Sequence, residues 1–160
     1  MGAVGLNGAA AKASSANERA KIASTGWTRW SPVNLVAIGA HLVGGAALLG
    51  ANRGRLAGQQ GVATVSAAKT VLTAAALGAT AWSRLLGKKV SEAGEAIVEG
   101  VTEPSAETPP EVAKAQRQLR VLQWAIPACT GALVVMNALM GEQQRPAAVA
   151  RGFAKRVLPA

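Results

Sequence analysis

The sequence of 160 residues contains no aspartate and no tyrosine, and it has one cysteine, one histidine and one phenylalanine. A single cysteine, Cys129, excludes a disulfide within the chain, and His41 has no companions that would complete a metal site. There is no Walker glycine-lysine motif and no pair of carboxylates in a segment with regular periodicity. We therefore expect neither an enzyme nor a bound metal or other cofactor.

Small residues and positive charge are abundant instead. Alanine occurs 36 times and glycine 18 times, and 17 Lys and Arg residues face 8 Glu residues for a formal net charge of +9. Soluble cores rely on larger side chains, so this composition with long uncharged stretches is typical of a membrane protein. The cations lie at the ends of those stretches and in the tails, where membrane orientation and lipid contact account for them. The expected partner is the lipid bilayer, and nucleic acid is not expected.

Three stretches are long enough to cross a hydrocarbon layer of about 30 Å as helices. Ser31 and Pro32 fit the N-cap and first helical residue of the first stretch. Lys69 interrupts the second stretch, whereas the third carries no charge. The sequence thus predicts an all-α, integral membrane helical bundle with three transmembrane helices, at residues 32–51, 61–83 and 121–141.

The chain divides into three parts around these spans. A polar basic N-terminal tail, 1–30, precedes the transmembrane helical domain, 31–142, and a basic amphipathic C-terminal tail, 143–160, follows it. The C-terminal tail is expected either to lie on anionic lipid or to fray. An acidic segment with two adjacent prolines, 88–110, is predicted to be a mobile loop.

A capping box is predicted at the start of the third helix, with Thr108 and Glu111 satisfying each other's backbone N–H groups. This helix should run from about Pro109 to Gly141. Its first turns, EVAKAQRQLR, are strongly polar and would project from the membrane as a stalk.

The basic residues and the tryptophans predict the orientation. With three spans, nine cations near span ends fall on the side of the N terminus and of the segment 84–120, against six on the other side. The positive-inside rule then makes the N terminus and the loop 84–120 cytoplasmic, in a multi-pass protein of the cell inner (plasma) membrane. All four tryptophans fall at that same interface: Trp27, Trp30, Trp82 and Trp124.

Three polar residues, His41, Lys69 and Thr130, are predicted at similar depths within the membrane. A polar pocket formed by them could bind a quinone-like head group or relay a proton. Two simpler interpretations stay open. His41 could be a packing residue that bonds a neighbouring hydroxyl or carbonyl, and Lys69 could reach the interface along its flexible stem.

Small residues recur at four-residue spacing in all three spans and predict helix-packing faces. Such faces let helix backbones approach closely in lipid, where no hydrophobic force drives association. Because three spans enclose little volume, we expect a homo-oligomer or a subunit of a larger membrane complex. The predicted packing residues are Ala40, Gly44, Gly50, Gly54, Ala74, Gly78, Ala128 and Ala132.

The segments SPVNLVAIGAHLVGG, LGANRGR, AAKTVLTAAALGATAWSRLLGKKV and TPPEVAKAQRQLRVLQWAIPACTGALVV together resemble uncharacterised small integral membrane proteins of actinobacteria. The resemblance covers residues 31–145 and brings no functional motif with it. More distantly, a bundle of short glycine-rich spans is similar to DoxX-like membrane proteins, which are associated with quinone or thiol redox chemistry. The chain departs from that group in having three spans where four are usual.

These observations lead to three hypotheses. The first is a non-enzymatic small integral membrane protein, an accessory or scaffolding component that acts through helix–helix contacts. The second, implied by the DoxX-like resemblance, is a redox-associated protein that binds a quinone-like lipophile. The third is a pore or holin-like oligomer, which the size and span count suggest.

Overall fold

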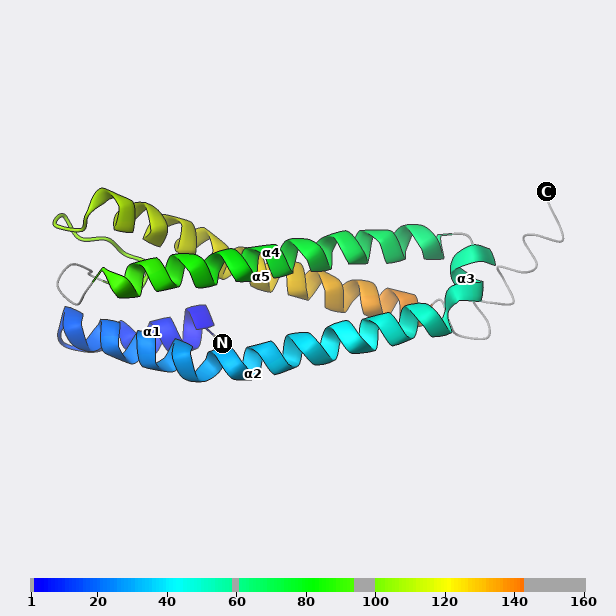
Figure 1. The fold of residues 1–160 in the computed structure, drawn as a ribbon, viewed down its shortest axis with the longest axis horizontal. Coiled ribbons are helices and arrows are strands. Elements are labelled where there is room, and N and C mark those ends of the chain that lie inside the picture. Colours follow the sequence, from blue (N-terminus) through cyan, green and yellow to red (C-terminus); the bar gives the residue numbers. More distant parts are fainter. Residues whose placement is uncertain (1, 59–60, 94–99, 143–160) are drawn as a thin grey trace.

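The computed structural model describes residues 2–58, 61–93 and 100–142, and these form a helical structure dominated by three long helices. They are α2 (Ala16–Ala51), α4 (Val62–Glu92) and α5 (Pro110–Glu142), and successive ones run in opposite directions (Figure 1). All three are long and apolar enough to cross a membrane. The predicted all-α class with three membrane-length helices is confirmed. The predicted C-terminal tail, 143–160, lies outside the described residues.

Three short elements complete the described chain. A π-helix, η1 (Gly2–Leu6), and α1 (Asn7–Ala10) lie beside the first half of α2, and α3 (Arg53–Gly58) follows α2 at its far end (Figure 1). Gly61 precedes α4 with φ of 82°, a left-handed conformation that glycine adopts without steric cost.

The first long helix begins sixteen residues earlier than the sequence predicts. Its N-cap is Ser15, whose Oγ accepts a hydrogen bond of 3.2 Å from the backbone N–H of Glu18. Ser31 and Pro32 lie inside α2, so the N-cap predicted there is wrong. The Ser15 to Glu18 spacing is itself that of a capping box. Much of the predicted N-terminal tail is therefore helical and continuous with the first span.

The third long helix matches its prediction to within one residue at each end. Its start differs in detail, because the backbone N–H of Thr108 donates to the carbonyl of Ser105 at 3.3 Å and not to the Glu111 carboxylate. The Glu111 carboxylate, predicted to reach back along the helix, accepts a hydrogen bond of 2.9 Å from Lys89 Nζ on α4. The predicted capping box is thus replaced, on the Glu111 side, by a bond between two helices.

The segment 88–110, predicted as a mobile loop, is partly helical and partly held against α5. Residues 88–92 belong to α4, and residues 94–99 lie outside the described residues. From Gly100 onward the chain is held by α5, because Gln116 Nε2 donates to the carbonyl of Gly100 at 3.0 Å. Arg120 Nη2 donates to the carbonyl of Thr102 at 3.2 Å and lies 3.6 Å from the Glu103 carboxylate.

This contact also changes the interpretation of the polar stalk at the start of α5. Gln116 is completely buried, and Ala115 is 2% exposed. One side of the stalk is therefore covered by the returning chain and by α4, whereas its charged side chains stay exposed.

Burial divides the molecule into two regions. We call residues 2–30, 84–93 and 100–120 the head, and residues 31–58, 61–83 and 121–142 the membrane half. Twelve described residues are buried, and only Val62, Ala76 and Leu133 of these belong to the membrane half. In the most apolar 18-residue window of each long helix, 0%, 11% and 6% of the residues of α2, α4 and α5 are buried. The head therefore contains most of the core that the single chain forms.

Helix length explains why there is a head at all. The long helices have 36, 31 and 33 residues, which at 1.5 Å per residue correspond to about 46–54 Å. A hydrocarbon layer of about 30 Å leaves roughly 15–25 Å of each helix outside it. The polar halves of all three helices lie at the same end of the molecule, and this end is the head (Figure 1).

Candidate functional site

The three polar residues predicted in the membrane lie on three different helices. His41 is ten residues before the end of α2, Lys69 seven residues after the start of α4, and Thr130 twelve residues before the end of α5. At 1.5 Å per residue these positions are about 10–18 Å from helix ends that lie at the same end of the molecule (Figure 1). Their predicted similarity in depth therefore holds along the helices.

No contact joins these three side chains into a pocket. Thr130 Oγ1 lies 3.1 Å from the carbonyl oxygens of Ile126 and Pro127 in its own helix. Within residues 2–58, 61–93 and 100–142, His41 and Lys69 have neither a hydrogen bond nor an ion pair, and His41 is exposed. A ligand site at these residues stays a prediction.

The predicted small-residue faces are open in the single chain. A Cβ atom added at Gly44, Gly50, Gly54 or Gly78 would meet nothing within 4 Å. The four alanines of the set are all exposed: Ala40, Ala74, Ala128 and Ala132. None of these glycines mediates a close approach within the described chain, so their packing role between chains stays a prediction.

Glycine does permit a close approach in the N-terminal segment, which the sequence analysis did not identify. A Cβ at Gly2 would overlap the Trp27 ring, and a Cβ at Gly26 would overlap the Leu6 side chain. The segment GAVGLNG, residues 2–8, thus packs directly on α2. The sequence offers only a pair of glycines, separated by about the length of a helical hairpin, as a signal for this contact. That signal alone is too weak to predict it.

Asn7 connects this segment to two long helices. Its Oδ1 accepts a hydrogen bond from Trp27 Nε1 on α2 at 3.1 Å, and its Nδ2 donates to Gln123 Oε1 on α5 at 3.2 Å. Among the described elements, α2 has only marginal direct contact with α4 and α5. The N-terminal segment is therefore the main link between α2 and the rest of the head.

Two side-chain bonds set the register of α4 against α5. Lys89 Nζ donates to Glu111 Oε2 at 2.9 Å, and Trp82 Nε1 donates to Gln118 Oε1 at 3.2 Å. Seven residues separate the two positions on each helix, so both bonds fit one antiparallel alignment. The Lys89 hydrogen bond and charge, together with the charge of Lys114, lower the pKa of Glu111 below its usual value.

An open groove lies beside this α4–α5 seam at the junction of the head and the membrane half. It is lined by Trp82, Lys114, Arg117, Gln118, Val121 and Leu122. Trp82 is 49% exposed, and Val121 is 67% exposed. The sequence alone does not group these cations with Trp82, because the grouping requires the register of α4 against α5.

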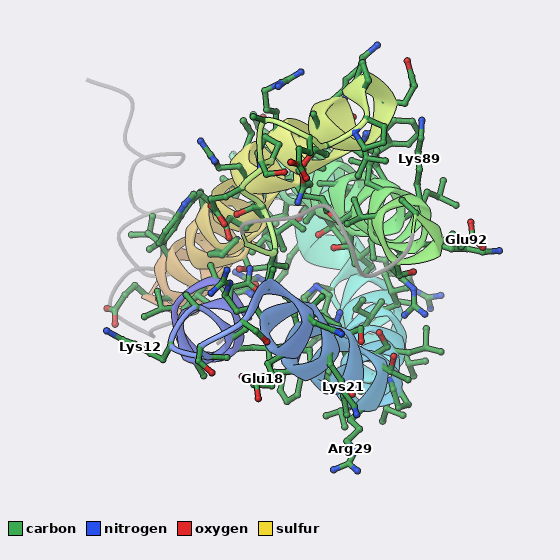
Figure 2. The ribbon with its side chains drawn as sticks, turned by 90° about the vertical axis from the view of Figure 1, so that its left-hand side faces the viewer. Lys12, Glu18, Lys21, Arg29, Lys89 and Glu92 are labelled. Carbon is green, nitrogen blue, oxygen red and sulfur yellow. The ribbon has the colours of Figure 1, made fainter. Side chains whose placement is uncertain are left out.

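Other charges lie on the outside of the head. Figure 2, viewed from the head end, shows Lys12, Lys21 and Arg29 on the outer side of the N-terminal segment and Glu92 at the outer edge of α4, whereas Lys89 extends toward α5. In the part of the chain that the structure describes, no group of three or more His, Cys, Asp or Glu side chains could hold a metal ion.

The chain was also compared with known proteins. No protein-family model, no curated protein and no solved structure matches it.

Proposed function

We propose that this chain is a non-enzymatic accessory or scaffolding protein of the plasma membrane, which assembles through contacts between its membrane helices. The observation that carries the proposal is the contrast between a packed head and membrane helices whose small-residue faces are open. In lipid, small residues matter mainly where another helix backbone approaches them. Because the chain does not use these faces itself, a second copy or a partner subunit is the natural occupant.

The charge of the head supports a cytoplasmic location for it. The N-terminal cations and those of residues 84–120 all lie in the head, and positively charged residues next to membrane spans favour the cytoplasmic side. A cysteine at Glu107 in a Cys129→Ala background should stay unlabelled by an impermeant thiol reagent in intact cells. Labelling before lysis would reverse the orientation.

Replacing Gly44 or Gly78 with leucine tests the assembly. Both positions have free space in the single chain, so the fold should persist while a close helix contact between chains is blocked. We expect loss of the oligomer or of the co-purifying partner in native mass spectrometry after mild extraction. Chemical crosslinking in the membrane before extraction measures the same loss independently.

Gly45→Leu is the matched control. Gly45 is also open, lies on the same helix, and is rotated by about 100° from Gly44 and about 140° from Gly50. An assembly that is unchanged in both Gly44→Leu and Gly78→Leu, or equally lost in Gly45→Leu, would contradict the proposal. A stoichiometric quinone-like mass on the protein, lost in His41→Ala, would replace it with the redox hypothesis.

A further inference from the structure

The α4–α5 seam changes character along its length. At the outer end Lys89 bonds Glu111, and one turn further along α5 lies Lys114. Next come the Trp82–Gln118 hydrogen bond and Arg117, and beyond these the groove is lined by the apolar side chains of Val121 and Leu122. The lining residues therefore change from two cations, which line the groove mainly with their hydrocarbon stems, to apolar side chains.

This gradient matches the layers of a bilayer. The uncharged stretch of α5 begins at Val121, which places Arg117 about 6 Å and Lys114 about 10 Å outside it at 1.5 Å per residue. The headgroup region extends about 5–8 Å beyond the hydrocarbon on each side, and a lysine stem is long enough to reach it. Trp82 sits at the same level, where indole rings favour the interface.

The electrostatics of the groove favour an anion. Glu111, the carboxylate closest to the groove along α5, is paired with Lys89. Arg117 has no hydrogen bond or ion pair with any described residue, and Lys114 contributes only a weak attraction to exposed Glu111. The four charges therefore leave an excess of two positive charges, carried by the two residues that line the groove.

We infer that this groove is a binding site for one anionic phospholipid of the leaflet that contacts the head. The lipid phosphate lies between Lys114 and Arg117, and an acyl chain follows Val121 and Leu122 past the Trp82 ring. The site is fixed by the α4–α5 register and does not depend on a helix contact at Gly44, which lies on α2. Gly78 is one turn from Trp82 on α4 and borders the groove, so Gly44→Leu is the variant that tests the assembly separately.

Native mass spectrometry of the full-length protein tests this inference. The protein is reconstituted in vesicles of equal parts phosphatidylglycerol and phosphatidylcholine and then released into mild detergent. We expect one retained phosphatidylglycerol per chain. The double variant Lys114→Gln, Arg117→Gln should lower that retention by about tenfold or more, because each cation near anionic lipid contributes strongly to binding.

Two control variants separate a defined site from general attraction to charge. Lys21→Gln with Arg29→Gln removes the same charge from side chains that point outward from α2 (Figure 2), and retention should stay at the wild-type level. The exchange Lys114→Arg with Arg117→Lys keeps the charge and should also retain the lipid. Circular dichroism checks that all variants are folded.

The outcomes are distinct. Equal retention by the groove variant and the wild type would overturn the inference, as would an equal loss in the α2 control or equal retention of phosphatidylcholine. A second copy of the chain or an acidic protein that is lost only in the groove variant would assign the groove to that occupant instead. Because Gly44→Leu leaves the groove intact, this variant should retain the lipid whether or not the assembly is lost.

Discussion

The head and the membrane half are built from the same three helices, yet they differ sharply in packing. The head contains nine of the twelve buried residues of the described chain. Hydrogen bonds of its residues Asn7, Gln116 and Arg120 connect segments that are distant in sequence. In the membrane half, side chains such as Val36, 74% exposed, and Val134, 67% exposed, have no cover. Apolar side chains in water gain free energy by burial, whereas in lipid they are already solvated. The difference shows that a single chain needs a core only where it meets water.

The largest effect is expected from enlarging a buried alanine of the head. Ala115→Leu adds volume at a position that is 2% exposed and should destabilise the head by about 1–3 kcal/mol. Hydrogen exchange of the backbone amides of residues 100–120 measures this change as lost protection. The same substitution at Ala138, exposed on the same helix in the membrane half, should leave that protection unchanged. Equal effects at both positions would remove the distinction between the two regions.

A smaller effect is expected from cutting the link between α2 and the α4–α5 pair. Asn7→Ala removes the bonds to Trp27 and Gln123, which together are worth about 1–2 kcal/mol. Spin labels on cysteines at Thr28 and Val121, in a Cys129→Ala background, should then show a broader distance distribution. The control Asn137→Ala, on the exposed surface of α5, should not broaden it. An unchanged distribution in Asn7→Ala would mean that other contacts hold α2.

The smallest effect is expected from acid titration of the Lys89–Glu111 pair. The lowered pKa of Glu111 means that its contribution to stability is complete above its usual value of 4.5 and is lost as the pH falls through the lowered pKa. Both groups are exposed, so the contribution is small. The thermal midpoint of Glu111→Gln should lie slightly below that of the wild type at pH 7, and the gap should close in acid.

Glu92→Gln is the matched control for this titration. Glu92 pairs with Lys88 within α4 at 3.6 Å, so its loss leaves the contact between α4 and α5 intact. Hydrogen exchange at the start of α5 should therefore respond to Glu111→Gln and not to Glu92→Gln. If the difference in thermal midpoint between the wild type and Glu111→Gln widened in acid, it would contradict the sign derived from the lowered pKa of Glu111.

Hydropathy predicted the helices well because each apolar stretch carries its own signal. The bounds of α5 are within one residue of the prediction, and the interrupted stretch around Lys69 is a continuous helix. The start of α2 was missed because Ser31 and Pro32 satisfy the same N-cap rule as Ser15 and Glu18. A search for apolar runs also cannot detect the helical turns that precede the membrane.

Local order in the polar segments could not be predicted, because it depends on partners that are far away in the chain. Gln116 stands among Gln, Arg and Lys residues of the expected stalk, and nothing nearby indicates that it alone is fully buried against Gly100. For the same reason, the sequence placed Lys114 and Arg117 just before the third span but could not join them to Trp82 in one groove.

The all-α class, the number of membrane-length helices and the larger number of Lys and Arg residues at one end follow directly from the order of the amino acids. Each depends on the composition of a continuous segment, because a helix satisfies its own backbone and enters lipid according to its own side chains. The fold of the head, the antiparallel register of Lys89 with Glu111 and of Trp82 with Gln118, and the link through Asn7 emerge only in three dimensions. They depend on contacts between residues up to 116 positions apart, whose free energy exists only after the helices have come together.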